Sequence, residues 1–192
     1  LNFISSWTKA YRNGNYFKAQ GTIKRSGDFS APNYLLSNTG TNENNISFSV
    51  GKNKILSQWK TNFSYFSQEI GILRSSHVGN VNDLVFAIES DEPTIINPFD
   101  YKVNSPKQIN KHHTANIQYS KRNILNGKLN AKYSWQRNNR KEYDVRRGDL
   151  KNKPALDLTL NTHDLLSNFQ WEKSNWSLDS GVFFQIQDNY SN

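Results

Sequence analysis

The connections between the predicted strands of this chain alternate between short and long. Segments with a two-residue hydrophobic period are joined at every other junction by tight polar turns, at 12–15, 51–54, 125–128 and 172–175. The junctions between those are long, charged and irregular, at 26–45, 68–111 and 138–158. This order places all short turns at one end of a sheet and all long loops at the other. A soluble sandwich has no reason to keep that separation, whereas outer-membrane β-barrels have short periplasmic turns and long extracellular loops.

Eight segments are predicted to be strands. The clearest is 55–67, where Trp59, Thr61, Phe63 and Tyr65 alternate with polar residues over about the ten residues that a tilted membrane strand requires. The others are predicted at 3–11, 16–25, 46–50, 113–119, 129–136, 158–171 and 176–187. The segment 158–171 alternates poorly, so we expect a β-bulge near 164–166, and its register stays open by a residue or two. The Asn-Gly pairs at 13–14 and 126–127 predict type I′ turns.

The chain is therefore expected to be all-β, an antiparallel transmembrane β-barrel segment of about eight strands. Aromatic residues gather near strand ends, as they do at the two interfaces of a membrane. The opposite face carries Lys, Gln and Asn, which a wet lumen accepts and a sandwich core rejects. We expect lipid contact for Trp59, Phe63, Ala131, Tyr133, Val182 and Phe184. We expect the lumen side for Lys60, Asn62, Lys132, Gln136 and Gln185.

Two other architectures stay open. Alternation also fits a soluble antiparallel β-sandwich that binds a glycan or a protein ligand, in which case Trp59, Phe63, Tyr133 and Phe184 would converge in one dry interior. An adhesin or a structural barrel is the other. A helical membrane span is excluded, because the mean hydropathy is −0.81 and the longest apolar run is 84–88.

Charge and motifs exclude several functions. The net charge is +8, but Lys and Arg are scattered, and 75–101 contains neither while Asp and Glu gather there. A surface that follows phosphates would not be divided in this way, so no nucleic-acid partner is expected. There is no Cys, and no nucleophile elbow, P-loop or Rossmann fingerprint is present. We therefore predict neither an enzyme nor a bound cofactor or metal ion.

Short stretches along nearly the whole chain carry a resemblance to a known family. They are RSGDF at 25–29 with APNY at 31–34, LSNTG at 36–40, EIGILR at 69–74, SHVGN at 76–80, HH at 112–113, QRNNRKEYDVRRG at 136–148, PALDL at 154–158 and TH at 162–163. In this order they resemble TonB-dependent outer-membrane receptors, particularly those of Bacteroidetes. The resemblance implies a middle section of a 22-stranded barrel.

The same resemblance implies the function and the partners. Receptors of this kind import large scarce ligands across the bacterial outer membrane, typically iron–siderophore chelates, and some import haem, cobalamin or glycans. An N-terminal plug domain fills their barrel and carries the TonB box through which TonB drives transport. Neither is found in residues 1–192, which we interpret as an interior piece of the barrel domain because they begin without Met or a signal peptide.

Candidate ligand-facing residues lie in the long connections. Arg74 and His77 occupy the second one, and Tyr143, Arg146 and Arg147 belong to the charged block 140–147. Arginines in such a block can bind an anionic chelate through charge-assisted hydrogen bonds. A solvated loop held together by its own alternating charges is the simpler reading of that block.

Overall fold

The computed structural model describes residues 1–76, 80–145, 150 and 152–191. Within these residues the chain forms one large antiparallel sheet of eight strands in the order β1-β2-β5-β6-β7-β8-β9-β10. The strands are β1 (Asn2–Ala10), β2 (Asn15–Ser26), β5 (Thr41–Asn53), β6 (Ser57–Gly71), β7 (Lys107–Ile124), β8 (Gly127–Tyr143), β9 (Leu156–Lys173) and β10 (Trp176–Ser191). The predicted all-β class and the antiparallel pairing are confirmed.

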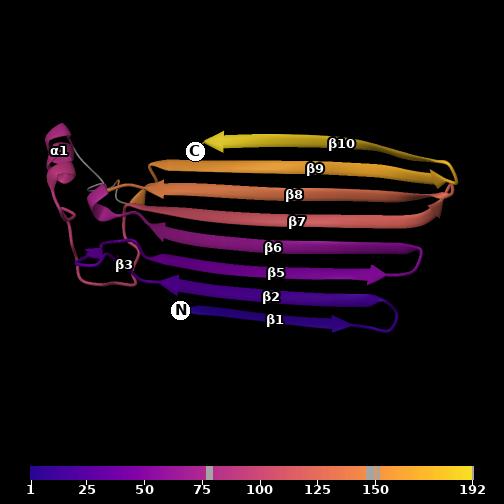
Figure 1. The fold of residues 1–192 in the computed structure, drawn as a ribbon, viewed down its shortest axis with the longest axis horizontal. Helices are drawn as coiled ribbons and strands as arrows, with labels where there is room; N and C mark the ends of the chain where they lie inside the picture. Colours follow the sequence, from indigo (N-terminus) through magenta and orange to yellow (C-terminus); the bar gives the residue numbers. More distant parts are fainter. Residues whose placement is uncertain (77–79, 146–149, 151, 192) are drawn as a thin grey trace.

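The short and long connections lie at opposite ends of the sheet (Figure 1). The turn end holds the connections 11–14, 54–56, 125–126 and 174–175. The loop end holds 27–40, which contains the small hairpin of β3 (Phe29–Ser30) and β4 (Leu35–Leu36), and 144–155. It also holds 72–106, with the 3₁₀ helix η1 (Arg74–Ser76) and the helix α1 (Val81–Glu89), which the sequence did not predict.

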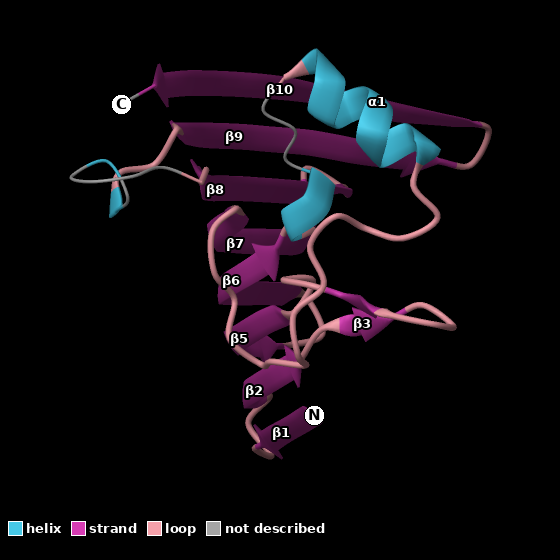
Figure 2. Ribbon diagram, turned by 90° about the vertical axis from the view of Figure 1, so that its left-hand side faces the viewer, coloured by secondary structure: helices cyan, strands magenta, loops and turns pink. Residues whose placement is uncertain are grey.

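The sheet is wide, twisted and open. Figure 2 shows β1 and β2 nearly end-on but β9 and β10 nearly lengthwise, which is the twist expected of a wide antiparallel sheet. Over the described residues β1 and β10 are the two edges, and they do not pair with each other. No helix in the described part of the chain is long and apolar enough to cross a bilayer.

Side chains on each face follow the predicted alternation. Paired residues share a face, and one continuous row runs across the sheet through Trp7, Ala19, Phe48, Phe63, Ala115, Trp135, His163 and Ile186. We call the face with this row the apolar face, and the other the polar face. The register also places all five Trp on the apolar face, and Lys60, Asn62, Lys132, Gln136 and Gln185 on the polar one.

Within the described residues, no second layer packs against the apolar face. Trp59, Phe63, Tyr133 and Phe184 are 37, 39, 42 and 56% exposed, so they do not converge in a dry interior. Among the described residues, Val103 of the loop end is the one buried hydrophobic side chain, at 7% exposure. The fold therefore leaves its largest apolar surface uncovered.

Several predicted boundaries were wrong. The turn predicted at 51–54 lies at 54–56, because β5 continues through Gly51 to Asn53. At Gly51 the Tyr16 ring lies where a side chain would stand, 2.7 Å from the position of a Cβ atom. The three long connections are shorter than predicted, because β5, β6, β7 and β8 extend further toward the loop end than their alternation does.

The turn chemistry also differs from the prediction. In the first hairpin only Gly14 of the Asn-Gly pair has a positive φ, 85°, and the Gly14 amide donates to the Tyr11 carbonyl, as in a four-residue turn. In the third hairpin, Leu125 and Asn126 have φ of 49° and 62°, one residue before the predicted pair. The bulge expected at 164–166 is absent from the described pairing, and the register shift lies between Arg122 and Ile124 instead.

Candidate functional site

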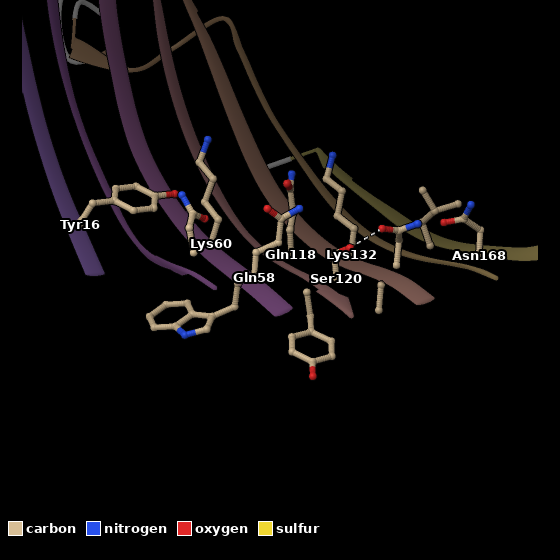
Figure 3. Close-up of a pocket in the computed structure, with 13 residues that line it drawn as sticks. Tyr16, Gln58, Lys60, Gln118, Ser120, Lys132 and Asn168 are labelled. Atoms are coloured by element: carbon tan, nitrogen blue, oxygen red, sulfur yellow. Dashed lines mark hydrogen bonds between the residues drawn. The ribbon is translucent and has the colours of Figure 1, made fainter. Parts of the chain in front are cut away.

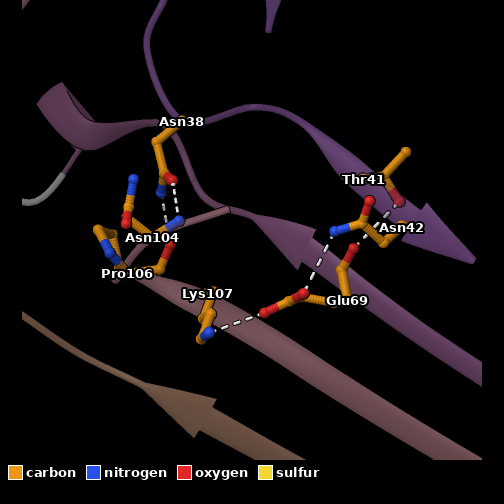
Figure 4. Close-up of polar contacts among 7 residues, drawn as sticks. All are labelled: Asn38, Thr41, Asn42, Glu69, Asn104, Pro106 and Lys107. Atoms are coloured by element: carbon orange, nitrogen blue, oxygen red, sulfur yellow. Dashed lines mark hydrogen bonds and ion pairs between the residues drawn. The ribbon is translucent and has the colours of Figure 1, made fainter. Parts of the chain in front are cut away.

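Asn38 organises the loop end by bonding three separated segments. Its side-chain amide donates to the carbonyls of Ile72, at 2.9 Å, and Pro106, at 2.8 Å, and its Oδ1 accepts the amide of Asn104 at 2.8 Å (Figure 4). Its φ of 64° is one that Asn tolerates better than most residues. Asn38 is buried, and its bond to the Pro106 carbonyl is buried with it, whereas the other two are partly buried. It thereby joins the 27–40 loop to both ends of the 72–106 loop.

Ser37 continues this connection. Its hydroxyl accepts the amide of Asn97 at 2.6 Å and lies 3.3 Å from the Ile95 carbonyl, and its own carbonyl accepts the amide of Arg74 at 3.1 Å. The side chain is fully buried. Backbone groups of segment 95–106 thus form hydrogen bonds to the side chains of Ser37 and Asn38, which hold this segment against the ends of β5 and β6.

Asp28 fixes the other side of segment 95–106. Its carboxylate accepts the amides of Thr39, at 2.8 Å, and Asp100, at 3.3 Å, and its own amide donates to the Asp100 carbonyl at 3.1 Å. Beside it, a Cβ atom on Gly27 would overlap the Phe99 ring. The glycine therefore allows Phe99 to lie directly on the backbone of the 27–40 loop.

These contacts enclose a hollow of about 700 Å³ at the loop end. Charged groups of both signs line it, together with amides and an aromatic ring: Asp28, Asn38, Arg74, Asn97, Pro98, Phe99, Asp100, Lys102, Asn104, Ser105, Asp144 and Val145. We call it the loop-end hollow. Its size is that of a pocket for a small organic molecule, and its mixed charges suit a polar ligand.

The structure places the predicted ligand-facing residues in different positions. Arg74 lines the loop-end hollow, where its Nη1 donates to the Ser105 carbonyl at 2.6 Å. Tyr143 is the last residue of β8 and lies on the apolar face, its ring centroid 5.6 Å from the Lys107 ammonium. His77, Arg146 and Arg147 lie outside the described residues. Asp28, Asn38, Phe99 and Lys102 were missed, because their roles depend on contacts between distant loops.

The polar face holds a second hollow, of about 320 Å³, near the turn end (Figure 3). Lys60, Gln118 and Lys132 stand side by side on this face, and Tyr16 and Asn168 flank them. Further along the strands, side chains bond across the sheet. Ser49 donates to Asn62 at 2.7 Å, and Asn62 donates to Asn116 at 2.8 Å. This face is built for contact with water or with polar groups.

The loop-end extension of the apolar face is also polar. There Lys107 pairs with Glu69 at 2.7 Å (Figure 4), and Lys141 pairs with Asp157 at 2.9 Å. The Lys141 ammonium and the Asn139 amide lower the pKa of the Asp157 carboxyl. These strand ends therefore belong in water.

The three histidines that the structure describes, His112, His113 and His163, do not lie together. His113 lies on the apolar face between Tyr65 and Trp135, and its neighbour His112 lies on the polar face. His163 is on the apolar face, where its Nδ1 is 2.8 Å from the Tyr133 hydroxyl. In the described ranges no group of three or more His, Asp or Glu side chains is arranged to hold a metal ion.

No protein-family model, curated protein or solved structure matches this chain.

Proposed function

We propose that this sheet is part of the wall of an outer-membrane β-barrel that imports a large ligand of the iron–siderophore class, with energy supplied through TonB. The observation that carries the proposal is the uncovered apolar band. It crosses every strand of the large sheet, and none of the described parts of the chain forms a layer against it. Exposed apolar patches on soluble monomers rarely exceed a few hundred Å².

The length of the band along the strands approaches that of a membrane span. On β6 it runs from Trp59 to Tyr65 and on β10 from Leu178 to Ile186, which is roughly 20 to 26 Å along the strand. A tilted transmembrane β-strand needs about 9–11 residues. Aromatic rings stand at both margins, as Tyr65 and Trp135 do toward the loops and Trp171 and Trp176 at the turns.

The band also slants across the strands. On β1 it extends from the row of Trp7 toward the loop end, to Phe3, while Lys9 follows on the turn side. On β10 it extends from Ile186, in the same row, toward the turn end, to Leu178. Its centre moves about six residues across the sheet, roughly 20 Å over strands about 4.8 Å apart, so the band lies about 30° from the perpendicular to the strands.

A slant of this size has a simple cause in a membrane. Strands of transmembrane barrels tilt by about 35–45° from the bilayer normal, so a horizontal slab of lipid meets each strand at a different residue. A soluble sheet has no reason to shift its apolar residues steadily from strand to strand. The slant therefore supports a tilted wall in lipid.

The other two surfaces have matching roles in this proposal. The polar face would line the lumen, where its hydrogen-bonded rows and Lys60 and Lys132 would contact water or the plug domain. The loop-end hollow would contact the ligand on the extracellular side, with Arg74 and Lys102 offering cations to an anionic chelate. Import by plug rearrangement and the roles of TonB and the plug rest on the family resemblance.

Quenching of tryptophan fluorescence tests the membrane part. In the complete protein folded into vesicles, we expect lipids brominated on their acyl chains to quench Trp59 and Trp135, and a water-soluble quencher to leave them largely unaffected. Replacing both by Phe should remove a defined share of the lipid quenching. A protein that is monodisperse in buffer without detergent, with these residues shielded inside it, would instead be the soluble sandwich.

Uptake by cells tests the transport part. Deleting the gene should abolish energy-dependent accumulation of radioactive iron from its chelates, and an uncoupler of the proton gradient should do the same to the parent strain. Unchanged iron uptake, with loss of haem, cobalamin or glycan uptake, would redirect the assignment to that ligand. If no uptake changes, the transport proposal is wrong even where the membrane part stands.

A further inference from the structure

Each of the four hairpins of the large sheet carries a lysine at the turn-end margin of the apolar face. The lysine lies two residues beyond the last apolar residue of the strand that enters the turn: Lys9 after Trp7, Lys52 after Val50, Lys121 after Tyr119 and Lys173 after Trp171. We call Lys9, Lys52, Lys121 and Lys173 the turn-end lysines. Within the described residues they recur in every hairpin of the large sheet.

The register places these lysines on the apolar face. Lys9 pairs with Phe17, Lys52 with Trp59, and Lys173 with Trp176. Lys121 pairs with both Ser57 and Leu129. Each lysine therefore projects on the side of the sheet that the proposed function places against lipid. The pairing thus sets Lys9, Lys52 and Lys173 opposite aromatic residues, and the Lys9 ammonium lies 5.3 Å from the centroid of the Tyr11 ring.

The turn-end lysines follow the slant of the band and not the register. From β1 to β9 they move steadily toward the turn end relative to the row of Trp7. Lysines placed only to pair with residues of a neighbouring strand would stay at a constant distance from the row of Trp7. These lysines keep to the margin of the apolar band instead.

No carboxylate neutralises them. In the described part of the chain the turn-end lysines form no ion pair, and the acidic residues nearest the turns, Glu172 and Asp179, lie on the polar face. The loop-end margin differs, because Glu69, Asp157 and Asp188 stand there among Lys107, Lys111, Arg137 and Lys141. The turn-end margin thus presents positive charge alone.

We propose that the turn-end lysines bind the phosphate groups of anionic phospholipids, such as phosphatidylglycerol, in the leaflet that borders the turns. This rests on the proposed membrane location. A lysine just beyond the apolar band would lie at the depth of the lipid phosphates, with its alkyl stem along the hydrocarbon and its ammonium free to donate. Basic residues near an anionic lipid surface each contribute about 1 kcal/mol of attraction, which is about a fivefold preference.

The test compares two lipids with the complete protein in vesicles. Tryptophan quenching by brominated phosphatidylglycerol, relative to brominated phosphatidylcholine, measures which lipid occupies sites beside Trp59, Trp171 and Trp176. We expect the parent protein to prefer phosphatidylglycerol. The variant K9Q/K52Q/K121Q/K173Q should lose that preference by at least about fivefold.

The matched control removes the same charge from the polar face. Lys18, Lys24, Lys60 and Lys132 lie on that face, so K18Q/K24Q/K60Q/K132Q should keep the preference of the parent. Arginine at the four turn-end positions should also keep it, because the charge is retained. If the glutamine variant does not assemble, K173Q alone, beside Trp171 and Trp176, gives the same comparison at one site.

The outcomes separate the two proposals. If neither brominated lipid quenches the tryptophans, the membrane location itself is wrong. If both quench equally in the parent, or if the polar-face control loses the preference as much as the turn-end variant, the membrane location stands and the lipid-binding inference is overturned.

Discussion

Two stretches of the same strand, β6, differ in how polar and apolar side chains are distributed over the two faces of the sheet. Between Trp59 and Tyr65 an apolar side chain on one face alternates with a polar one on the other. Between Ser67 and Glu69 both faces are polar, and Glu69 bonds to Lys107 and Asn42 on the neighbouring strands. In the first stretch no described part of the protein covers the side chains on the apolar face. In the second stretch the side chains on that face form hydrogen bonds and ion pairs with those of neighbouring strands.

The difference indicates which solvent suits each stretch. Polar pairs such as Glu69 with Lys107 and Asp157 with Lys141 are at home in water, where the apolar stretch alone would be a liability. A continuous strand that contains both stretches is expected to pass from one solvent into another. Four substitutions, each with its own control, test this difference.

A charge in the centre of the band has the largest expected effect. Phe63→Arg should destabilise the complete protein in vesicles by about 2–4 kcal/mol, because a cation at the middle of the bilayer loses its hydration. Urea denaturation in vesicles measures it. Ser67→Arg, four residues along the same face, is the control and should cost at most about 1 kcal/mol near the interface. Equal costs at the two positions would contradict the change of solvent along β6.

Asn38→Ala addresses the loop end alone. Removing its three hydrogen bonds, which are buried or partly buried, should release segment 95–106, which we expect to exchange amide hydrogens roughly 30-fold faster, equivalent to about 2 kcal/mol. Exchange in β5 to β8 within the band should not change. Asn38→Gly separates causes, because Gly tolerates the φ of 64° and lacks the bonds. If Gly restores protection, backbone strain and not bonding explains the effect.

The two faces within the band can be compared at adjacent residues. Asn62→Leu removes the bonds to Ser49 and Asn116 on the polar face and should cost about 1 kcal/mol. Thr61→Val, next to it on the apolar face, should be neutral or slightly stabilising. Urea midpoints in vesicles give both values. A stabilised Asn62→Leu would mean that the polar face is not in contact with water or polar groups.

The smallest expected effect is a pH dependence at the loop end. The pKa of Asp157 is lowered by Lys141, so its stabilisation is present at pH 7 and is lost as the pH falls below about 4 toward the folded-state pKa. Because this pair reaches solvent, the change should stay under about 1 kcal/mol. Asp157→Asn should abolish this part of the acid dependence, measured by denaturation between pH 7 and pH 3. Asp91→Asn in the exposed loop should leave it unchanged.

The sequence could predict the band but not the extensions beyond it. Alternation identified the strands around Phe63, Tyr133 and Phe184 and the face of each side chain, because only one face there is apolar. Where both faces are polar, alternation vanishes although the backbone pairing continues. The ends of β5, β6, β7 and β8 were therefore assigned to loops.

Other misses have equally local causes. On β9, Leu160 and Leu166 lie on the polar face while Asn161 and His163 lie on the apolar one, which blurs the alternation without any bulge. Gly51 suggested a turn, whereas it makes room for the Tyr16 ring inside a strand. Within the candidate site, Arg74 could be proposed from its loop, but the bonds of Asn38 join residues up to 68 positions apart and leave no local signal.

The oblique course of the apolar residues amounts to a stagger of about one residue for each added strand. That stagger constrains what may pair with the unpaired backbone of β1 and β10. In a strand that pairs with β10, the apolar residues must begin about one residue nearer the turn end than they do in β10. In a strand that pairs with β1, they must begin about one residue further from the turn end than they do in β1. In the proposed membrane wall, any other stagger would carry apolar side chains out of the lipid or, after a single-residue slip, onto the polar face. The eight strands of the sheet thus already limit the register in which a further hairpin can pair with either edge.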